Sequence, residues 1–185
     1  EKVKSKKVDV QPSLFDEFLD EDSGIIKYSN LSELTSTNVK YQLIDNQHDI
    51  DEFLAKISTQ QFFCFDVETT GISPYSDELV GISFSWVKNE AYFILLPIDR
   101  LEAENFLRQL KPLFSDEAKL KIGQNLKFDI SFLESYGISV KGPFFDTMIA
   151  HYLLQPELKH NLDYLAEVFL NYKMISYEVL CGEKG

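Results

Sequence analysis

The chain has few cysteines, few basic residues relative to its acidic ones, and no long hydrophobic run. Its 185 residues include two cysteines, Cys64 and Cys181, whose spacing suits neither a zinc site nor a disulfide framework. Lys and Arg number 18 against 30 Asp and Glu, and the net charge of −12 argues against a broad basic surface for duplex DNA. No apolar stretch is long enough to span a membrane, and no signal-peptide pattern is present. We therefore expect a soluble, cytoplasmic, monomeric protein.

What the chain does contain falls into two parts. Residues 1–38 are lysine-rich, then acidic, then rich in Ser, Thr and Asn with little periodicity, which is linker composition. From Val39 the apolar pattern becomes regular, and a chain that is 44% hydrophobic and 14% aromatic can bury one sizeable core. We predict a linker over 1–38 and a folded domain over 39–185.

Two acidic residues end an apolar, aromatic, strand-like run at Phe62–Gly71. Side chains alternate along a strand, so Asp66 and Glu68 point to the same side, where each carboxylate raises the pKa of the other. A hard divalent cation such as Mg²⁺ or Mn²⁺ would relieve that repulsion, because it prefers carboxylate oxygen. The alternative is a solvated acidic turn after a strand.

A second motif, Lys121–Asp129, reads as a short strand turning into a helix. We expect Asn125 to be the N-cap and Gly137 to supply the left-handed stop. Asp129 then lies one turn into the helix, where the positive end of the helix dipole would help to hold it ionised. The simpler interpretation of Asp129 is dipole complementation without further function.

The remaining periodicities predict an α/β fold with a mixed sheet flanked by helices. The strands 62–67, 80–86 and 91–95 are expected to be antiparallel neighbours. Further strands are expected at 39–44, 119–123 and 138–140. Helices are expected around 50–57, from Ala103 to a stop near Pro112, and over 125–136, 146–154 and 162–170, with Asp146 as an N-cap.

The motifs FDVETTG (65–71) and GQNLKFD (123–129) are followed by Phe145–Met148 and His160–Ala166. In this order and spacing they resemble the proofreading 3′–5′ exonuclease domain of bacterial family A DNA polymerases, within the DEDD exonuclease superfamily. The resemblance covers roughly 39–185 and implies a ribonuclease-H-like architecture. It also implies that the 1–38 linker joins this domain to a preceding one.

The resemblance implies roles for the three carboxylates. Asp66 would bridge two Mg²⁺ or Mn²⁺ ions, Glu68 would bind the ion that activates the attacking water, and Asp129 would hold the second ion, partly through water. The reaction would be hydrolysis of the terminal phosphodiester at a single-stranded 3′ end of DNA.

The resemblance also implies substrate contacts. Thr69 would contact the terminal 3′-hydroxyl, and Ile72 would lie beside the last base. Gln124 and Asn125 would meet the phosphates of the strand.

Two aromatic residues complete the implied substrate contacts. Phe128 stands where close relatives often have Tyr, and Tyr177 corresponds to an aromatic on which a base can stack. The alternatives are that Ile72 and Phe128 are core residues and that Tyr177 is an ordinary surface aromatic.

The fourth acidic ligand of the family lies in a Tyr-x-x-x-Asp motif, and no such motif follows Leu165 in this sequence. The resemblance therefore suggests a domain cut short before its last motif and a weakly active or inactive fragment. The rival functions are a non-catalytic structural domain of the polymerase and a stand-alone RNA-trimming nuclease of the same superfamily.

A five-residue motif lies within the linker. Gln11, Leu14 and Phe15 match the Gln-x-x-Leu-Phe peptide by which bacterial polymerases dock on the sliding clamp. The alternative is a linker segment that folds its apolar side chains back on the domain.

Overall fold

The computed structural model describes residues 39–175 and 179. The predictions for Gln11, Leu14, Phe15 and Tyr177 lie outside these residues. The chain divides into two compact units, of which Thr35–Leu162 is the larger. The smaller one includes Asp163–Gly185, whose described part carries helix α6 (Leu162–Leu170) from its second residue onward.

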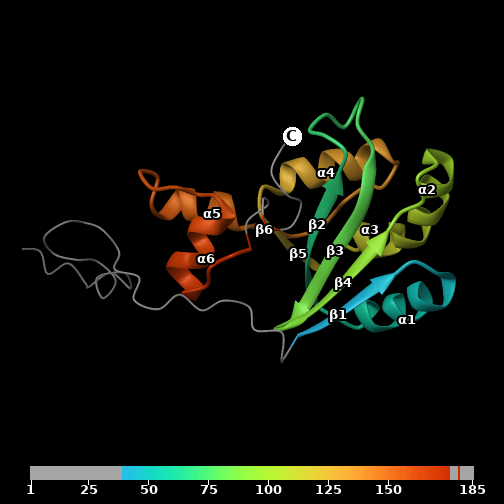
Figure 1. Cartoon of the computed structure of the whole chain (residues 1–185), viewed down its shortest axis with the longest axis horizontal. Helices are drawn as coiled ribbons and strands as arrows, with labels where there is room; N and C mark the ends of the chain where they lie inside the picture. The colour runs from blue at the N-terminus through green and yellow to red at the C-terminus, as the bar shows by residue number, and fades with distance from the viewer. Residues whose placement is uncertain (1–38, 176–178, 180–185) are drawn as a thin grey trace, which may run out of the picture. The chain divides into compact units, whose positions relative to one another are not determined.

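The larger unit contains all six described strands (Figure 1). They are β1 (Lys40–Ile44), β2 (Phe62–Thr69), β3 (Leu79–Val87), β4 (Glu90–Leu95), β5 (Leu120–Gly123) and β6 (Phe144–Asp146). Its helices are α1 (Gln47–Ser58), α2 (Arg100–Leu107), the 3₁₀ turn η2 (Arg108–Leu110), α3 (Lys111–Ser115), α4 (Leu126–Ser135) and α5 (Thr147–Leu154).

The strands form one mixed sheet in the order β1-β4-β3-β2-β5-β6. β2, β3 and β4 are antiparallel neighbours, as predicted, and the pairs β1/β4, β2/β5 and β5/β6 are parallel. The antiparallel centre follows from short connections, and each parallel pair is joined by a longer crossover. The predicted mixed α/β class is confirmed.

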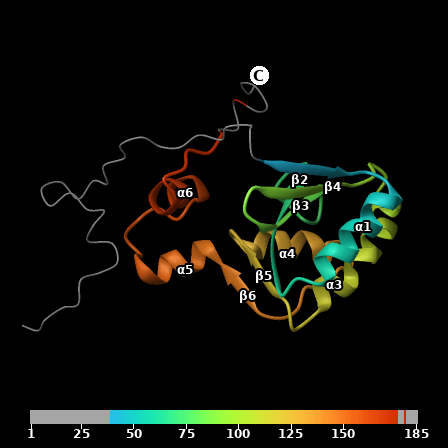
Figure 2. The same ribbon diagram turned by 90° about the horizontal axis from the view of Figure 1, so that it is seen from below.

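The core lies between the sheet and helices α1–α4. In β2 the side chains of Phe63, Phe65 and Val67 are buried on one face, as the period of two predicts. The ring of Phe114 from α3 packs edge-on against Phe63 and Phe65, with centroids 5.9 and 5.2 Å apart. Figure 2 shows α1, α3 and α4 on the same side of β2, β3 and β4. The acidic residues of β2 therefore point to the other face.

Two local predictions are wrong. Pro112 does not end a helix: α2 tightens into η2, and Pro112 then occupies the first turn of α3, where proline needs no hydrogen-bond partner. Residues 138–140 form no strand, because the N–H of Ile138 bonds to Leu133 O at the end of α4. The edge strand is instead β6, which pairs with β5.

Candidate active site at the end of strand β2

Asp66 and Glu68 lie on the open face of β2, as predicted, and both are exposed. Partial loss of hydration and then the charge of Glu68 raise the pKa of Asp66 to about 6. A groove of about 380 Å³ opens beside Asp66, between β2, β3, β5 and the start of α5. Asp66 thus borders a hollow large enough to receive part of a substrate.

Asp129 approaches β2 at the point where this strand and β5 part. β5 pairs with β2 only as far as Cys64, so the N–H of Val67 lies beyond the ladder. Asp129 Oδ1 accepts a hydrogen bond from Val67 N at 3.0 Å, although Asp129 belongs to α4. This bond places the carboxylate of α4 next to the residue that follows Asp66.

Burial works against the ionised form predicted for Asp129. The side chain is only 1% exposed, and this burial raises its pKa to about 7. The hydrogen bond from Val67 opposes the rise, and the negative charge of Asp66 adds to it. In the metal-free protein the loss of hydration therefore opposes the ionisation that the helix dipole would favour.

The start of α4 is also built differently from the prediction. Asn125 has a left-handed backbone (φ 61°), and its side chain makes no cap. Asp146 supplies the missing acceptors: its carboxylate accepts from Asn125 N at 3.1 Å and Leu126 N at 2.8 Å. It also caps its own helix through Met148 N and Ile149 N, as predicted. One carboxylate therefore fixes two helix starts, a role that sequence reasoning missed.

The residues after Glu68 form a tight exposed turn. Thr69 Oγ1 donates to Gly71 O at 2.6 Å, and Ile72 is 87% exposed, which rules out a core role for Ile72. Phe128 is partly buried, packs against the core and lies 4.9 Å from the ring of Phe132. The alternative of a packing role therefore holds for Phe128, while its contact with substrate stays a prediction.

Gln124 ties the site to the chain after α5. Its Nε2 donates to His160 O at 2.6 Å, and its Oε1 accepts from the Thr147 hydroxyl. The His160 ring in turn lies with its Nδ1 2.7 Å from Nδ1 of His151. Both ends of the Gln124 amide are thus engaged within the protein, and the phosphate contact predicted for it stays a prediction.

The type and charge of these carboxylates suit a divalent cation, but their positions do not form a complete set of ligands. Asp66 and Asp129 both have raised pKa values, and the charge of Asp66 contributes to the rise at Asp129. A cation between them would relieve this repulsion. Among residues 39–175 and 179, however, no three His, Cys, Asp or Glu side chains form a group that could hold a metal ion. The structure brings Asp66 close to Glu68 and Asp129 without closing a three-ligand site.

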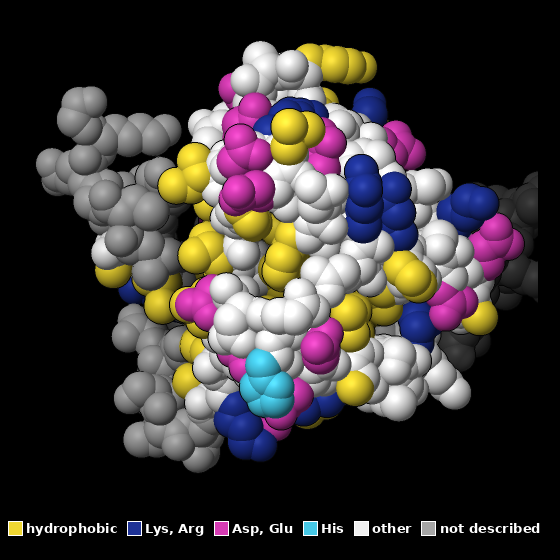
Figure 3. All heavy atoms as spheres, turned by 90° about the vertical axis from the view of Figure 1, so that its right-hand side faces the viewer, with side chains coloured by type: hydrophobic (Ala, Val, Ile, Leu, Met, Phe, Trp, Pro, Cys, Tyr) yellow, Lys and Arg dark blue, Asp and Glu magenta, His cyan; other side chains and the backbone are white. Residues whose placement is uncertain are grey.

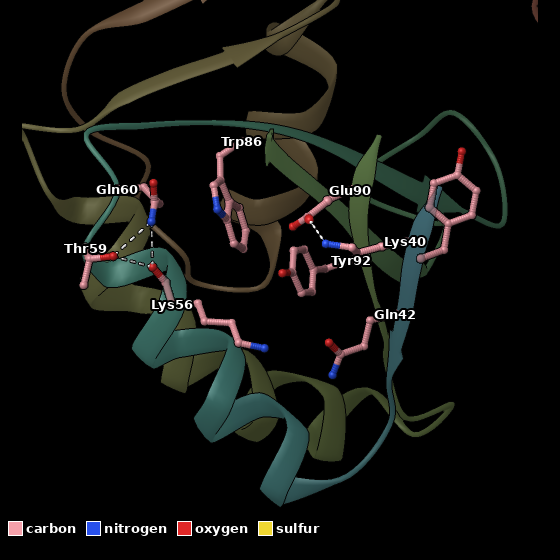
Figure 4. A pocket seen from close by; sticks show the side chains of 9 residues that line it. Lys40, Gln42, Lys56, Thr59, Gln60, Trp86, Glu90 and Tyr92 are labelled. Atoms are coloured by element: carbon pink, nitrogen blue, oxygen red, sulfur yellow. Dashed lines mark hydrogen bonds and ion pairs between the residues drawn. The ribbon is translucent and has the colours of Figure 1, made fainter. Parts of the chain in front are cut away.

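A second hollow, of about 670 Å³, has different chemistry (Figure 4). It lies by α1 and the strands β1, β3 and β4, where Trp86 and Tyr92 stack with centroids 4.6 Å apart. Lys40 pairs with Glu90 at 2.6 Å, and the ammonium of Lys56 lies 5.9 Å from the Tyr92 ring centre. This lining has one carboxylate and two ammonium groups, so it is not a second acidic site.

A family model described as 3′–5′ exonuclease matches residues 41–185. The chain belongs to this exonuclease family. The match covers both acidic motifs and confirms the resemblance predicted from FDVETTG and GQNLKFD.

Two curated relatives are each called DNA polymerase I. The relative from Borreliella burgdorferi is 34% identical over 154 residues, which is 80% of this chain. The relative from Pseudomonas aeruginosa is 34% identical over 154 residues, which is 78% of this chain. The exonuclease chain spans 17% of the length of each of them.

Solved structures confirm the ribonuclease-H-like fold. The catalytic core of RRP6 from Trypanosoma brucei superposes with a TM-score of 0.65 at 16% identity, covering 83% of this chain and 41% of that one. Brucella melitensis NrnC with bound Mg²⁺ gives a TM-score of 0.61 at 20% identity, covering 80% of this chain and 70% of that one. No helix among the described residues is long and apolar enough to cross a membrane.

Proposed function

We propose that the chain is the proofreading module of a bacterial DNA polymerase I and removes nucleotides from single-stranded 3′ ends of DNA. The reaction is hydrolysis of the terminal phosphodiester, which releases a nucleoside 5′-monophosphate. Support comes from the family and from the DNA polymerase I relatives. The polymerase activity of the whole protein and its place in the bacterial cytoplasm belong to the same proposal.

The observation that carries the proposal is that Asp66 lies close to both Glu68 and Asp129 near the point where β2 and β5 part. Asp66 and Glu68 share one strand face, and Asp129 is fixed to the backbone of that strand. Holding these negative charges near Asp66 without a counter-ion is unfavourable, as the raised pKa values of Asp66 and Asp129 indicate. A functional cation explains why the fold keeps them there.

We propose that Asp66, Glu68 and Asp129 would hold Mg²⁺ or Mn²⁺. A divalent metal held there would activate the attacking water and stabilise the negative charge that develops on the oxygens of the displacement. The side chains of Thr69, Ile72, Gln124, Asn125, Phe128 and Tyr177 are proposed to position the strand.

The test is removal of Asp66. In the full-length protein, Asp66→Ala should lower the release of nucleotides from a mismatched, 3′-labelled strand by at least about 100-fold, because it takes away a metal ligand. The fold should persist, with unfolding of the metal-free protein unchanged or slightly harder, since repulsion is relieved. Glu134→Gln, which removes an exposed carboxylate from α4, is the matched control and should leave the rate unchanged.

The alternatives give different outcomes in the same assay. Equal nucleotide release by the Asp66→Ala variant and the parent protein would support the alternative of a non-catalytic, structural domain. Trimming of an RNA oligonucleotide with no action on DNA of the same sequence would instead support a stand-alone RNA nuclease. Docking of Gln11, Leu14 and Phe15 on a sliding clamp and a monomeric state stay predictions.

A further inference from the structure

Tyr75 lies in the connection between β2 and β3 and is 97% exposed. Its neighbour Ile72 is 87% exposed in the same connection, which begins directly after Glu68 and Thr69 of β2. Exposing an aromatic ring to water brings no stability to the fold. The packing of this unit therefore does not account for the position of Tyr75.

The segment that carries Tyr75 is a closed turn. Asp77 N donates to Ser73 O at 2.9 Å, and Ser73 N donates to Asp77 Oδ2 at 2.8 Å. Pro74 stands at the first corner of this turn, where its fixed φ is favoured, and Tyr75 follows at the second corner. A Cβ at Gly71 would lie 2.4 Å from Asp77 Oδ2, so the Asp77 carboxylate packs directly against the glycine. The ring is thus presented at the tip of an ordered turn.

The base of the turn is anchored to two helices. Thr70 N donates to Glu78 O at 2.9 Å, which closes the connection. The Glu78 carboxylate accepts from the hydroxyl of Tyr136, which directly follows α4, and from Arg100 Nη1 of α2 at 3.1 Å. The Tyr136 hydroxyl accepts from Leu79 N at 3.0 Å, and Arg100 lies 4.3 Å above the Tyr136 ring. Because α4 also carries Asp129, the same helix helps to hold both the base of the turn and this carboxylate.

Charge decides which kind of contact can hold a nucleic acid here. The chain has a net charge of −12, and Asp66, Glu68 and Asp129 form the site itself. Phosphate contacts from basic residues therefore contribute little near the reacting end. Stacking of a base on an aromatic ring is independent of net charge and contributes about 1–3 kcal/mol per base.

We propose that Tyr75 is a substrate-positioning residue whose ring stacks on a base of the single-stranded 3′ end. This inference rests on the proposed exonuclease function and adds a contact outside the residues assigned above. The phenol ring supplies the contact and its hydroxyl does not, so phenylalanine should replace tyrosine.

The first test measures binding without cleavage. A 5′-fluorescein-labelled oligothymidylate of about eight nucleotides is titrated with the protein in Ca²⁺, free of Mg²⁺ and Mn²⁺, and Kd is read from anisotropy. Tyr75→Ala should raise Kd about 5- to 150-fold, the equivalent of the stacking loss, and Tyr75→Phe should retain the parent affinity. Tyr41→Ala removes another exposed tyrosine, from the far edge strand β1, and should leave Kd unchanged.

The second test locates the base. Single abasic sites are moved along the oligonucleotide, and Kd is measured for the parent and for Tyr75→Ala. At one position the abasic site should raise the Kd of the parent protein. The same abasic site should not raise the Kd of the Tyr75→Ala protein, which has already lost the stacking contact. In steady-state cleavage by the full-length protein, Tyr75→Ala should raise KM and leave kcat nearly unchanged. The unfolding midpoint should not move, because the ring is exposed.

The outcomes separate this inference from the proposed function. Cleavage and binding by Tyr75→Ala equal to those of the parent would overturn the stacking role and leave the exonuclease proposal standing. A parent protein that neither binds nor cleaves the oligonucleotide would overturn both. Loss of binding in Tyr75→Phe, or a lowered unfolding midpoint in Tyr75→Ala, would also contradict the inference, since each points to a role other than stacking.

Discussion

Asp129 ties the chemistry of the site to the stability of the fold. Its carboxylate is buried and its pKa rises from 3.8 to about 7 in the folded protein. The folded state therefore binds more protons than the unfolded state between these two values. By linkage, the free energy of unfolding falls as pH rises through this window and levels off above it.

We predict that Asp129→Asn removes much of this pH dependence in the metal-free protein. The difference in slope between parent and variant should approach about 1.4 kcal/mol per pH unit near pH 5–6, the value for one proton. Urea unfolding in EDTA at a series of pH values measures it. Mn²⁺ should stabilise the parent more at pH 8 than at pH 5, because protons compete for the ligands at pH 5. Parallel pH curves for parent and variant would contradict the assigned burial of Asp129.

At the residue scale, the sequence predicts which face of a strand a residue occupies more reliably than it predicts the pKa of that residue. The period of two along β2 was enough to put Asp66 and Glu68 on one face. The raised pKa of Asp129 depends on how closely α4 packs against β2 and on the N–H of Val67, which β5 leaves open. Neither feature is local, so the pattern within α4 alone did not predict the raised pKa of Asp129.

Among the secondary structure elements, α4 and α5 share a single carboxylate at their starts. Asp146 is the last residue of β6, which runs parallel to β5, and Gly123 and Asp146 are in register. The two strands therefore end side by side, and one side chain reaches the free N–H groups of both helices. This arrangement fixes the start of the helix that carries Asp129.

We predict that Asp146→Ala destabilises the protein by about 2–3 kcal/mol, roughly twice the loss from a single cap. The matched control is Asp99→Ala, which removes the N-cap of α2, where the carboxylate accepts from Glu102 N at 3.0 Å. That variant should lose about 1 kcal/mol. Denaturant unfolding compares them, and exonuclease rates should fall further in Asp146→Ala because Asp129 loses its support. Equal losses in the two variants would show that the bonds to α4 contribute nothing.

Most elements were predictable, and the exceptions have physical reasons. In long segments such as α1 and β2, one face is buried, so the period of the apolar residues shows whether the segment is a helix or a strand. Strand β6 has only three residues, which is too short for a period. Ile138 and Val140 alternate like a strand, but both are buried after α4 without a strand partner. The turn at Asn125 adopts a left-handed backbone because the cap comes from Asp146, a residue distant in sequence.

On the scale of the whole molecule, acidic side chains outnumber basic ones. Figure 3 shows the side of the larger unit that carries α1 and α2, where acidic and basic side chains are interspersed and the described residues form no continuous basic stripe. With 30 acidic and 18 basic residues in the chain, the average field repels a phosphate backbone. Binding of a single strand must therefore depend on short-range contacts and bound cations.

We predict that single-stranded DNA binding by this chain depends only weakly on monovalent salt. For single strands the slope of log K against log salt is about −0.7 per phosphate neutralised, so fewer than about two such contacts give a slope shallower than about −1.5. Anisotropy titrations of a labelled oligothymidylate between about 50 and 300 mM KCl, at fixed Ca²⁺, measure the slope. Tyr75→Ala should weaken binding at every salt concentration without changing the slope, because stacking releases no counterions. A slope near −4 or steeper would mean that lysines and arginines neutralise about six phosphates, and DNA binding would then depend on a basic surface instead of the turn that carries Tyr75.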